Sequence, residues 1–269
     1  MAVKNLLPKF YSLIKSFSHQ SVYSFVSRML HKTKGIVLQT INYSETSLIV
    51  KMYTRSFGLQ SYMIKGTRSK KSKHKANLFQ PLALVEMVVS NVNKNSLQQV
   101  SELNIAHPYS HLPYNIIKSA IALFLNEVLY KALHEGNPDE DMFDFIENSL
   151  LILDLKQENC SNFHICFMVQ LSRYLGFYPQ GNYSKEFSVF DLREGCFVNK
   201  IPLHSFYLGN RFSSLLSDVI TSNYESIYKL ALENNERKHL LNAIILFYQL
   251  HIETFKELKS QEILHQVIE

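Results

Sequence analysis

A run of positive charge lies between two apolar segments of the sequence. Residues 65–75 read KGTRSKKSKHK, and no acid interrupts their six cations, which are Lys65, Arg68, Lys70, Lys71, Lys73 and Lys75. Lys and Arg at this density neutralise phosphates, and a Ser-rich run with few bulky side chains offers charge without base-edge geometry. The run therefore indicates salt-sensitive, weakly sequence-specific binding of a polyanion, although a solvated linker or a targeting signal has a similar composition.

Three further cations and several aromatic residues precede this run. The cations are Lys34, Lys51 and Arg55, and the interleaved aromatic residues are Tyr43, Tyr53, Phe57 and Tyr62. Nucleic-acid strands bind such surfaces because Lys and Arg neutralise phosphates and because bases stack on aromatic rings, at about 1–3 kcal/mol per base. Packing inside the fold is the commoner fate of any single ring, and it competes with stacking at Tyr53 and Tyr62 above all.

The distribution of charge along the chain supports a polyanionic partner. Residues 1–75 hold fourteen Lys and Arg but one acid, Glu45, whereas the remainder holds fourteen Lys and Arg and 22 acids. A compact domain normally intersperses the two signs, so the split predicts that the N-terminal part faces nucleic acid while the C-terminal part has another role.

Residues that could carry catalysis or hold a metal are sparse and poorly spaced. The three cysteines, Cys160, Cys166 and Cys196, form no CxxC pair, which predicts free thiols in a reducing compartment and no zinc site. The acids 139–141 suit the first turn of a helix better than a metal. Neither a phosphate-binding glycine loop nor an HExxH or GxSxG motif occurs, so we expect no enzyme, no cofactor and no metal.

Short alternating segments predict a β-barrel as the element that positions the cations. Five strands are expected within residues 34–106, and the basic run falls after the third strand. The strands cover residues 34–43, 47–54, 59–66, 81–90 and 96–106. Five short strands with a long basic loop suit the OB-fold, a Greek-key barrel that often binds single-stranded nucleic acid.

The hydrophobic period changes to 3.6 residues after His107-Pro108, which predicts an all-α domain over residues 107–269. Helices are expected over residues 115–133, 139–155 and 162–177, with shorter ones later and a long closing helix over 236–268. Residues 178–203 are expected to be irregular or to form short strands. The fold class is therefore α+β in two domains, a barrel over residues 29–106 and a helical domain over 107–269.

The first 28 residues do not fit this scheme. They carry four bases, six Ser and no acid, and apolar residues recur at helical spacing between residues 5 and 17. A transit peptide and a membrane-surface helix share this composition. We favour a third interpretation, an upstream extension before a start at Met29 that adds nothing to the fold.

The order of several short motifs resembles the RecO family of bacterial recombination mediators. The N-terminal motifs are GIVL (35–38), NYSETSLIV (42–50), YTRSFG (53–58), KGTRSKKS (65–72) and LFQPL (78–82). The helical half adds QLSRYLGFYP (170–179) and a closing LLNAIILFYQLHIETFKELKSQEIL (240–264). Many family members carry a four-cysteine zinc site after the LGFYP-like segment, but only Cys196 stands there in this chain, so a metal-free version is implied.

The resemblance implies a non-enzymatic DNA-binding protein of recombinational repair in the RecF pathway. Proteins of this kind bind single- and double-stranded DNA and anneal complementary strands. They contact the acidic tail of single-stranded-DNA-binding protein and act with RecR to load RecA. A cytoplasmic, nucleoid-associated location away from membranes is implied as well. Lys118 and Arg173 are our candidates for the rim of a tail-binding groove. An RNA-binding accessory factor and an enzyme with an unrecognised site in the helical half are the alternatives.

Overall fold

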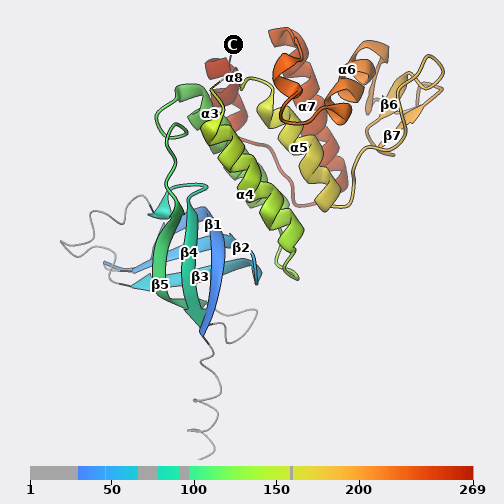
Figure 1. Cartoon of the computed structure of the whole chain (residues 1–269). Helices are drawn as coiled ribbons and strands as arrows, with labels where there is room; N and C mark the ends of the chain where they lie inside the picture. The colour runs from blue at the N-terminus through green and yellow to red at the C-terminus, as the bar shows by residue number, and fades with distance from the viewer. Residues whose placement is uncertain (1–29, 46, 66–77, 91–96, 158–159, 269) are drawn as a thin grey trace, which may run out of the picture.

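The chain folds into a β-barrel and a helical domain that pack against each other (Figure 1). The structure is a computed structural model that describes residues 30–45, 47–65, 78–90, 97–157 and 160–268. The N-terminal extension predicted over residues 1–28 therefore lies outside the described residues. None of the described helices is long and apolar enough to cross a membrane.

Five strands close the barrel in the order β1-β2-β3-β5-β4. They are β1 (Leu30–Asn42), β2 (Ser47–Thr54), β3 (Gly58–Lys65), β4 (Leu84–Ser90) and β5 (Gln98–His107). All pairs are antiparallel except β3 with β5, and this parallel pair closes the Greek key of an OB-type barrel. The predicted five-stranded barrel is thus confirmed, and the basic run lies between β3 and β4.

Strand β1 pairs with a neighbouring strand along each of its two halves. It pairs with β4 from Leu30 to Ile36 and with β2 from Gly35 to Asn42, with a register shift after Val37 that bends the strand. A Cβ on Gly35 would lie 2.9 Å from Cε of Met87, so a larger residue there would displace the flexible end of the Met87 side chain. Leu48, Val50 and Met52 of β2 fill the interior, as their alternation predicts.

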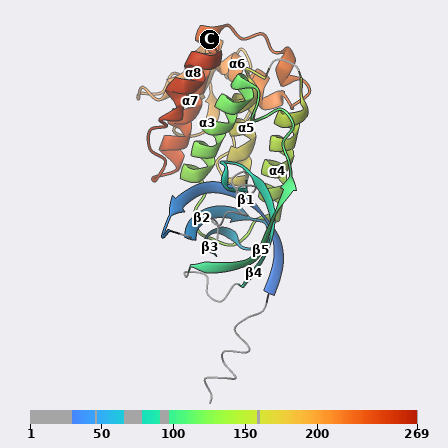
Figure 2. The same cartoon turned by 90° about the vertical axis from the view of Figure 1, so that its left-hand side faces the viewer.

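The outer surface of the barrel shares a second core with the helices. Ile36, Leu38, Tyr53 and Leu59 are buried in the same cluster as the apolar faces of the helices. Figure 2 shows the helices stacked on one side of the barrel, with the N-terminal half of α4 (Glu140–Leu155) beside it. The two domains are therefore joined by an apolar contact as well as by the connecting chain.

The remaining helices follow the predicted order. They are α3 (Ile116–Ala132), α5 (Phe163–Tyr174), α6 (Asn210–Thr221), the short 3-10 helix η2 (Ile227–Lys229), α7 (Asn234–His251) and α8 (Ser260–Ile268). Asn115 caps α3 and Asp139 caps α4, each accepting backbone N–H groups of the first turn. Gly176, with φ +88°, follows the end of α5 as predicted.

Short strands, one of the two outcomes expected for residues 178–203, do form in the helical domain. A three-stranded antiparallel sheet of β6 (Val189–Asp191), β7 (Cys196–Val198) and β8 (Tyr207–Leu208) lies between α5 and α6. Phe190 and Phe197 are buried and pack edge to face with ring centroids 5.0 Å apart. Aromatic packing therefore stabilises this small sheet, and its strands are too short to show a clear alternation in the sequence.

The prediction of a single closing helix over residues 236–268 is wrong. The chain leaves the helix after His251, buries Phe255 and Leu258, and begins α8 at Ser260. Glu127 of α3 accepts hydrogen bonds from the backbone N–H groups of Lys259 (3.1 Å) and Ser260 (2.8 Å). Burial alone would raise the pKa of Glu127, but hydrogen bonds from Lys131 and Ser260 lower it to about 2. This carboxylate thus holds the start of α8 against α3, an interaction over 130 residues that no local pattern shows.

Candidate nucleic-acid interface

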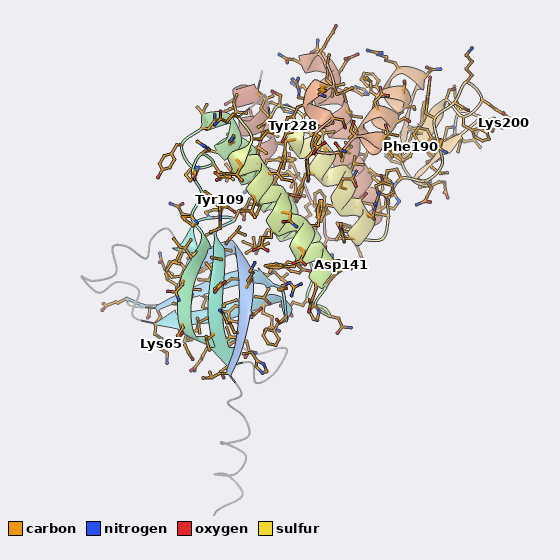
Figure 3. The ribbon with its side chains drawn as sticks, viewed as in Figure 1. Lys65, Tyr109, Asp141, Phe190, Lys200 and Tyr228 are labelled. Carbon is orange, nitrogen blue, oxygen red and sulfur yellow. The ribbon has the colours of Figure 1, made fainter. Side chains whose placement is uncertain are left out.

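The predicted cations fall into three groups on the barrel. Lys65 is exposed at the end of β3 and opens the basic run. Figure 3 shows it on the side of the barrel opposite Asp141 of α4. The rest of the run, Arg68, Lys70, Lys71, Lys73 and Lys75, lies outside the described residues. Its role in binding DNA therefore stays a prediction.

Lys34 and Arg55 form the second group, and both meet carboxylates of α4. Lys34 Nζ donates to the two carboxylate oxygens of Glu147, at 2.8 and 3.0 Å. Arg55 donates from Nε and one terminal nitrogen to the two oxygens of Asp144, at 2.9 and 3.0 Å, and its other terminal nitrogen lies 3.0 Å from Glu140. The hydrogen bonds of this pair lower the pKa of Asp144 and raise that of Arg55.

Lys51 forms the third group, and Lys32, which lines a cavity together with Lys34 and Arg55, adds a cation to the second. Lys51 Nζ lies 4.9 Å from the ring centroid of Tyr130, an attractive cation–π contact. Lys32 was missed in the sequence, and its Nζ lies 3.2 Å from a carboxylate oxygen of Glu86. Both pairs leave the ammonium groups near the surface, where a phosphate could also reach them.

Two of the predicted stacking residues are corrected by the structure. Tyr62 is fully buried inside the barrel, and burial raises its pKa to about 12. Tyr53 lies on the outer surface of the barrel but is covered by α4, where its ring stacks against Phe143 with centroids 6.2 Å apart. Because neither ring has a free face, neither can stack on a base in this structure.

The other two aromatic residues keep a solvent-facing side. Tyr43 follows β1 and is 61% exposed. Phe57 is half-buried between β2 and β3, and its ring meets the edge of His31 with centroids 5.4 Å apart. Base stacking at Tyr43 and Phe57 stays a prediction.

The two residues expected at the rim of a tail-binding groove lie in different environments. Lys118 is buried, and its Nζ donates to the backbone oxygen of Asp154 at 2.7 Å, so its assignment to an exposed rim is wrong. Arg173 is exposed at the end of α5 and lies 4.4 Å from the ring of Tyr178. Its role in binding a partner stays a prediction.

A groove lies where the barrel meets α3. Its volume is about 750 Å³, and its walls include Ile105, Tyr109 and Leu123. Figure 3 labels Tyr109 at the top of the barrel, where the chain passes to the helices, and its hydroxyl donates to the backbone oxygen of Leu82 at 2.8 Å. Among the described residues, no Lys or Arg lines this groove.

No catalytic or metal-binding cluster appears among the described residues. No three His, Cys, Asp or Glu side chains gather there in a way that could hold a metal ion. Cys160 and Cys166 are buried in the helical domain, and burial raises the pKa of Cys166 to about 12. The segment 178–208 contains Cys196 as its one thiol. A four-cysteine zinc site therefore does not fit the residues present.

Sequence reasoning missed the carboxylates that meet the barrel. Glu140, Asp144 and Glu147 recur at helical spacing along α4, and the first of them was attributed to the helix terminus alone. The spacing shows that the three share one face of a helix, but it does not show what that face meets. The fold and the site together define a two-domain protein, a Greek-key barrel with surface cations joined to a helical domain.

Comparison with known sequences identifies the family. Residues 29–109 match the family profile described as "Recombination protein O N terminal", and residues 113–262 match "Recombination protein O C terminal". The chain belongs to the RecO family, whose members are non-enzymatic recombination mediators, so the expectation that it is not an enzyme is confirmed by its family.

Full-length relatives support the same assignment. The chain is 38% identical over 239 residues to "DNA repair protein RecO" of Phocaeicola vulgatus, covering 89% of this chain and 99% of the relative. It is 37% identical over 242 residues to "DNA repair protein RecO" of Bacteroides fragilis, covering 90% and 100%. The protein of that name from Flavobacterium psychrophilum is 37% identical over 238 residues, covering 88% and 98%.

Proposed function

We propose that this protein binds single- and double-stranded DNA through the cations of its barrel, anneals complementary strands and helps to load RecA on DNA coated with single-stranded-DNA-binding protein. The observation that carries the proposal is the match of both domains, in order, to the two RecO profiles. The relatives matched over nearly their whole length are named as DNA repair proteins.

The charge of the barrel supports this function. Annealing brings two polyanionic strands together, so their phosphates must be screened at once. Lys65 lies exposed at the end of β3, and five more Lys and Arg follow it within ten residues of sequence. A run without bulky or base-reading side chains offers this screening with little dependence on sequence, as an annealing protein requires.

The test removes charge from the run. We expect that changing Lys70, Lys71, Lys73 and Lys75 to Ala weakens binding of single-stranded DNA and flattens the slope of log affinity against log salt. The slope should lose about 0.7 for each phosphate contact removed. Fluorescence anisotropy with a labelled oligonucleotide at several NaCl concentrations measures both quantities.

The matched control changes four exposed lysines of the helical domain to Ala, Lys185, Lys200, Lys229 and Lys256, for the same loss of charge. We expect a smaller effect on the slope, because these residues belong to the helical domain and not to the barrel. Equal slopes for the two quadruple variants would remove the run from the binding site. Competition with RNA of equal length shows whether DNA is the preferred strand.

We further propose that the protein acts in the cytoplasm with the acidic tail of single-stranded-DNA-binding protein, with RecR and, through them, with RecA. Exposed Arg173, at the end of α5, is the remaining candidate for contact with the tail. The test is strand annealing on DNA coated with single-stranded-DNA-binding protein, with and without that protein's C-terminal tail. Annealing at the same rate on both would exclude the tail as a partner.

A further inference from the structure

One side of the barrel already holds anions in the place where DNA phosphates would bind. The anions are Glu140, Asp144 and Glu147, which lie four and three residues apart along α4 and form its carboxylate stripe. Two oxygens of Asp144 meet two nitrogens of Arg55, and two oxygens of Glu147 meet the ammonium of Lys34. A phosphate offers two oxygens to Arg in the same bidentate manner, so carboxylate and phosphate are interchangeable partners here.

These ion pairs are open to water. The side chains of Lys34 and Arg55 are 42% and 40% exposed, and those of Asp144 and Glu140 are 43% and 61% exposed, whereas Glu147 is more covered, with 15% of its side chain exposed. A cavity of about 400 Å³ lies beside them, with Lys32, Lys34 and Arg55 all in its walls. Ion pairs at the surface contribute little to stability, so exchange of one anion for another costs little free energy.

The domain contact does not depend on these pairs. Beside them, Phe143 of α4 is fully buried and stacks against Tyr53 of the barrel. The hydroxyl of Tyr53 also donates to the backbone oxygen of Asp139 at 3.3 Å. Because this apolar contact uses no carboxylate of the stripe, Lys34 and Arg55 can change partners without breaking it.

We infer that the carboxylate stripe of α4 competes with nucleic-acid phosphates for Lys34 and Arg55, and so lowers the affinity of the barrel for DNA. The inference rests on the proposed function and adds a built-in brake to it. In the free protein the two cations are neutralised by α4. DNA must displace the stripe, so the exposed cations such as Lys65 engage first and Lys34 and Arg55 follow. Releasing or neutralising the stripe would strengthen the hold on a strand.

The test neutralises the stripe with Glu140→Gln, Asp144→Asn and Glu147→Gln in the full chain. We expect single-stranded DNA to bind about tenfold more tightly at low salt, because two more cations become available to phosphates. The slope of log affinity against log salt should steepen by about 1.4, which corresponds to two further phosphate contacts. Fluorescence anisotropy across a NaCl series measures both, and thermal unfolding checks that each variant is folded.

Two further variants separate competition from general charge repulsion. The first neutralises three exposed acids of the helical domain, Glu186→Gln, Glu225→Gln and Glu253→Gln, for the same change in net charge. It should gain much less affinity, and an equal gain would overturn the inference. The second adds Lys34→Ala and Arg55→Ala to the neutralised stripe. The gain should then disappear, and a gain that persists without these two cations would also overturn the inference.

The results distinguish the inference from the proposed function. If the folded wild-type chain binds DNA and the neutralised stripe changes neither affinity nor slope, the brake is wrong and the proposed function stands. If no folded variant binds DNA at any salt concentration, both are wrong. If the wild type binds weakly and the neutralised stripe binds tightly, both are supported.

Discussion

The two ends of α4 hold the rest of the chain in opposite ways. Near its N-terminus, Asp144 and Glu147 meet Arg55 and Lys34 of the barrel in partly exposed ion pairs. At its C-terminus, Asp154 is fully buried and accepts hydrogen bonds from the backbone N–H groups of Ser110 (2.9 Å), His111 (2.8 Å) and Leu112 (2.6 Å). The first end meets the barrel itself, and the second meets the segment that leads from the barrel to α3.

The two ends differ in the free-energy cost of breaking the contacts that each carboxylate makes. A carboxylate released at the surface is solvated again by water, so its ion pair can exchange at low cost. Asp154 is buried away from water, and the N–H groups that donate to it would be left unpaired in the interior. The connection between the domains is therefore fixed, while the polar contact between α4 and the barrel is open to exchange.

The largest effect is expected from Asp154→Ala, which removes the fixed end. It leaves three backbone N–H groups without their acceptor and should lower the free energy of unfolding by about 3 kcal/mol. Urea unfolding followed by circular dichroism measures it. Asn148→Ala, an exposed change on the same helix, is the control and should alter stability little. A loss no larger than that of the control would show that Asp154 is not a fixed point.

A second prediction extends the contrast to a buried base and to pH. His164 is buried in α5, and its Nδ1 has no hydrogen-bond partner within the described part of the chain. Its pKa is lowered to about 3, first by burial and then by the nearby Arg237 and His265. In the unfolded chain the His164 imidazole binds a proton below about pH 6.5, whereas in the folded chain it does so only below about pH 3. Stability therefore falls as pH falls between those values. The loss from pH 7 to pH 5 should be about 2 kcal/mol.

Urea unfolding at several pH values measures this loss, and His164→Leu should remove most of the slope. The Asp154 carboxylate affects stability in a lower range of pH. Burial opposes its charge, but the backbone hydrogen bonds lower its pKa, so its contribution is present above about pH 4 and is lost as pH falls further. An unchanged slope between pH 7 and pH 5 in His164→Leu would assign the effect to another group.

A smaller effect is expected from Tyr53→Phe, which tests whether the apolar contact alone holds α4 to the barrel. The variant keeps the ring against Phe143 and loses the hydrogen bond to the backbone oxygen of Asp139. That oxygen still accepts from the backbone N–H of Phe143, so the cost should be about 0.5–1 kcal/mol. Tyr53→Ala, which also removes the ring, should cost several times more, and equal losses would argue against the apolar contact.

The smallest effect is expected at the exchangeable end. Glu140→Gln should change the free energy of unfolding by about 0.3 kcal/mol at low salt, because its side chain is 61% exposed and exposed ion pairs contribute little. Addition of 1 M NaCl should abolish the difference from the wild type, since salt screens surface charges. Urea unfolding at both salt concentrations is the measurement. A loss comparable with that of Asp154→Ala would erase the distinction between the two ends.

Much of the fold follows from local patterns. The alternation in SLIVKMYT places Leu48, Val50 and Met52 inside the barrel, and Asp139 before an apolar helical period marks the start of α4. The same patterns mislead where distant contacts decide. The break between α7 and α8, which the helical period of the sequence does not show, is held by Glu127 of α3, over 130 residues away.

The candidate site divides along the same line. The positive charge of the barrel segment could be counted in the sequence, and the order of its motifs pointed to the RecO family. The sequence could not show whether each charged or aromatic side chain is free to contact a nucleic acid. Arg55 and Asp144 are 89 residues apart in sequence and bond to each other in space, and Tyr53 loses its free face to α4.

The sequence by itself determined most of the elements, their order, the excess of positive charge in the N-terminal part and the family. These properties depend on residue types and on the periods of two and 3.6 residues along the chain, so they are local. The tertiary structure alone decided which cations face solvent, which face the carboxylates of α4, and that Lys118 and Tyr62 are buried. The reason is physical: burial and ion pairing depend on which surfaces the folded chain brings together, and those surfaces come from segments far apart in sequence.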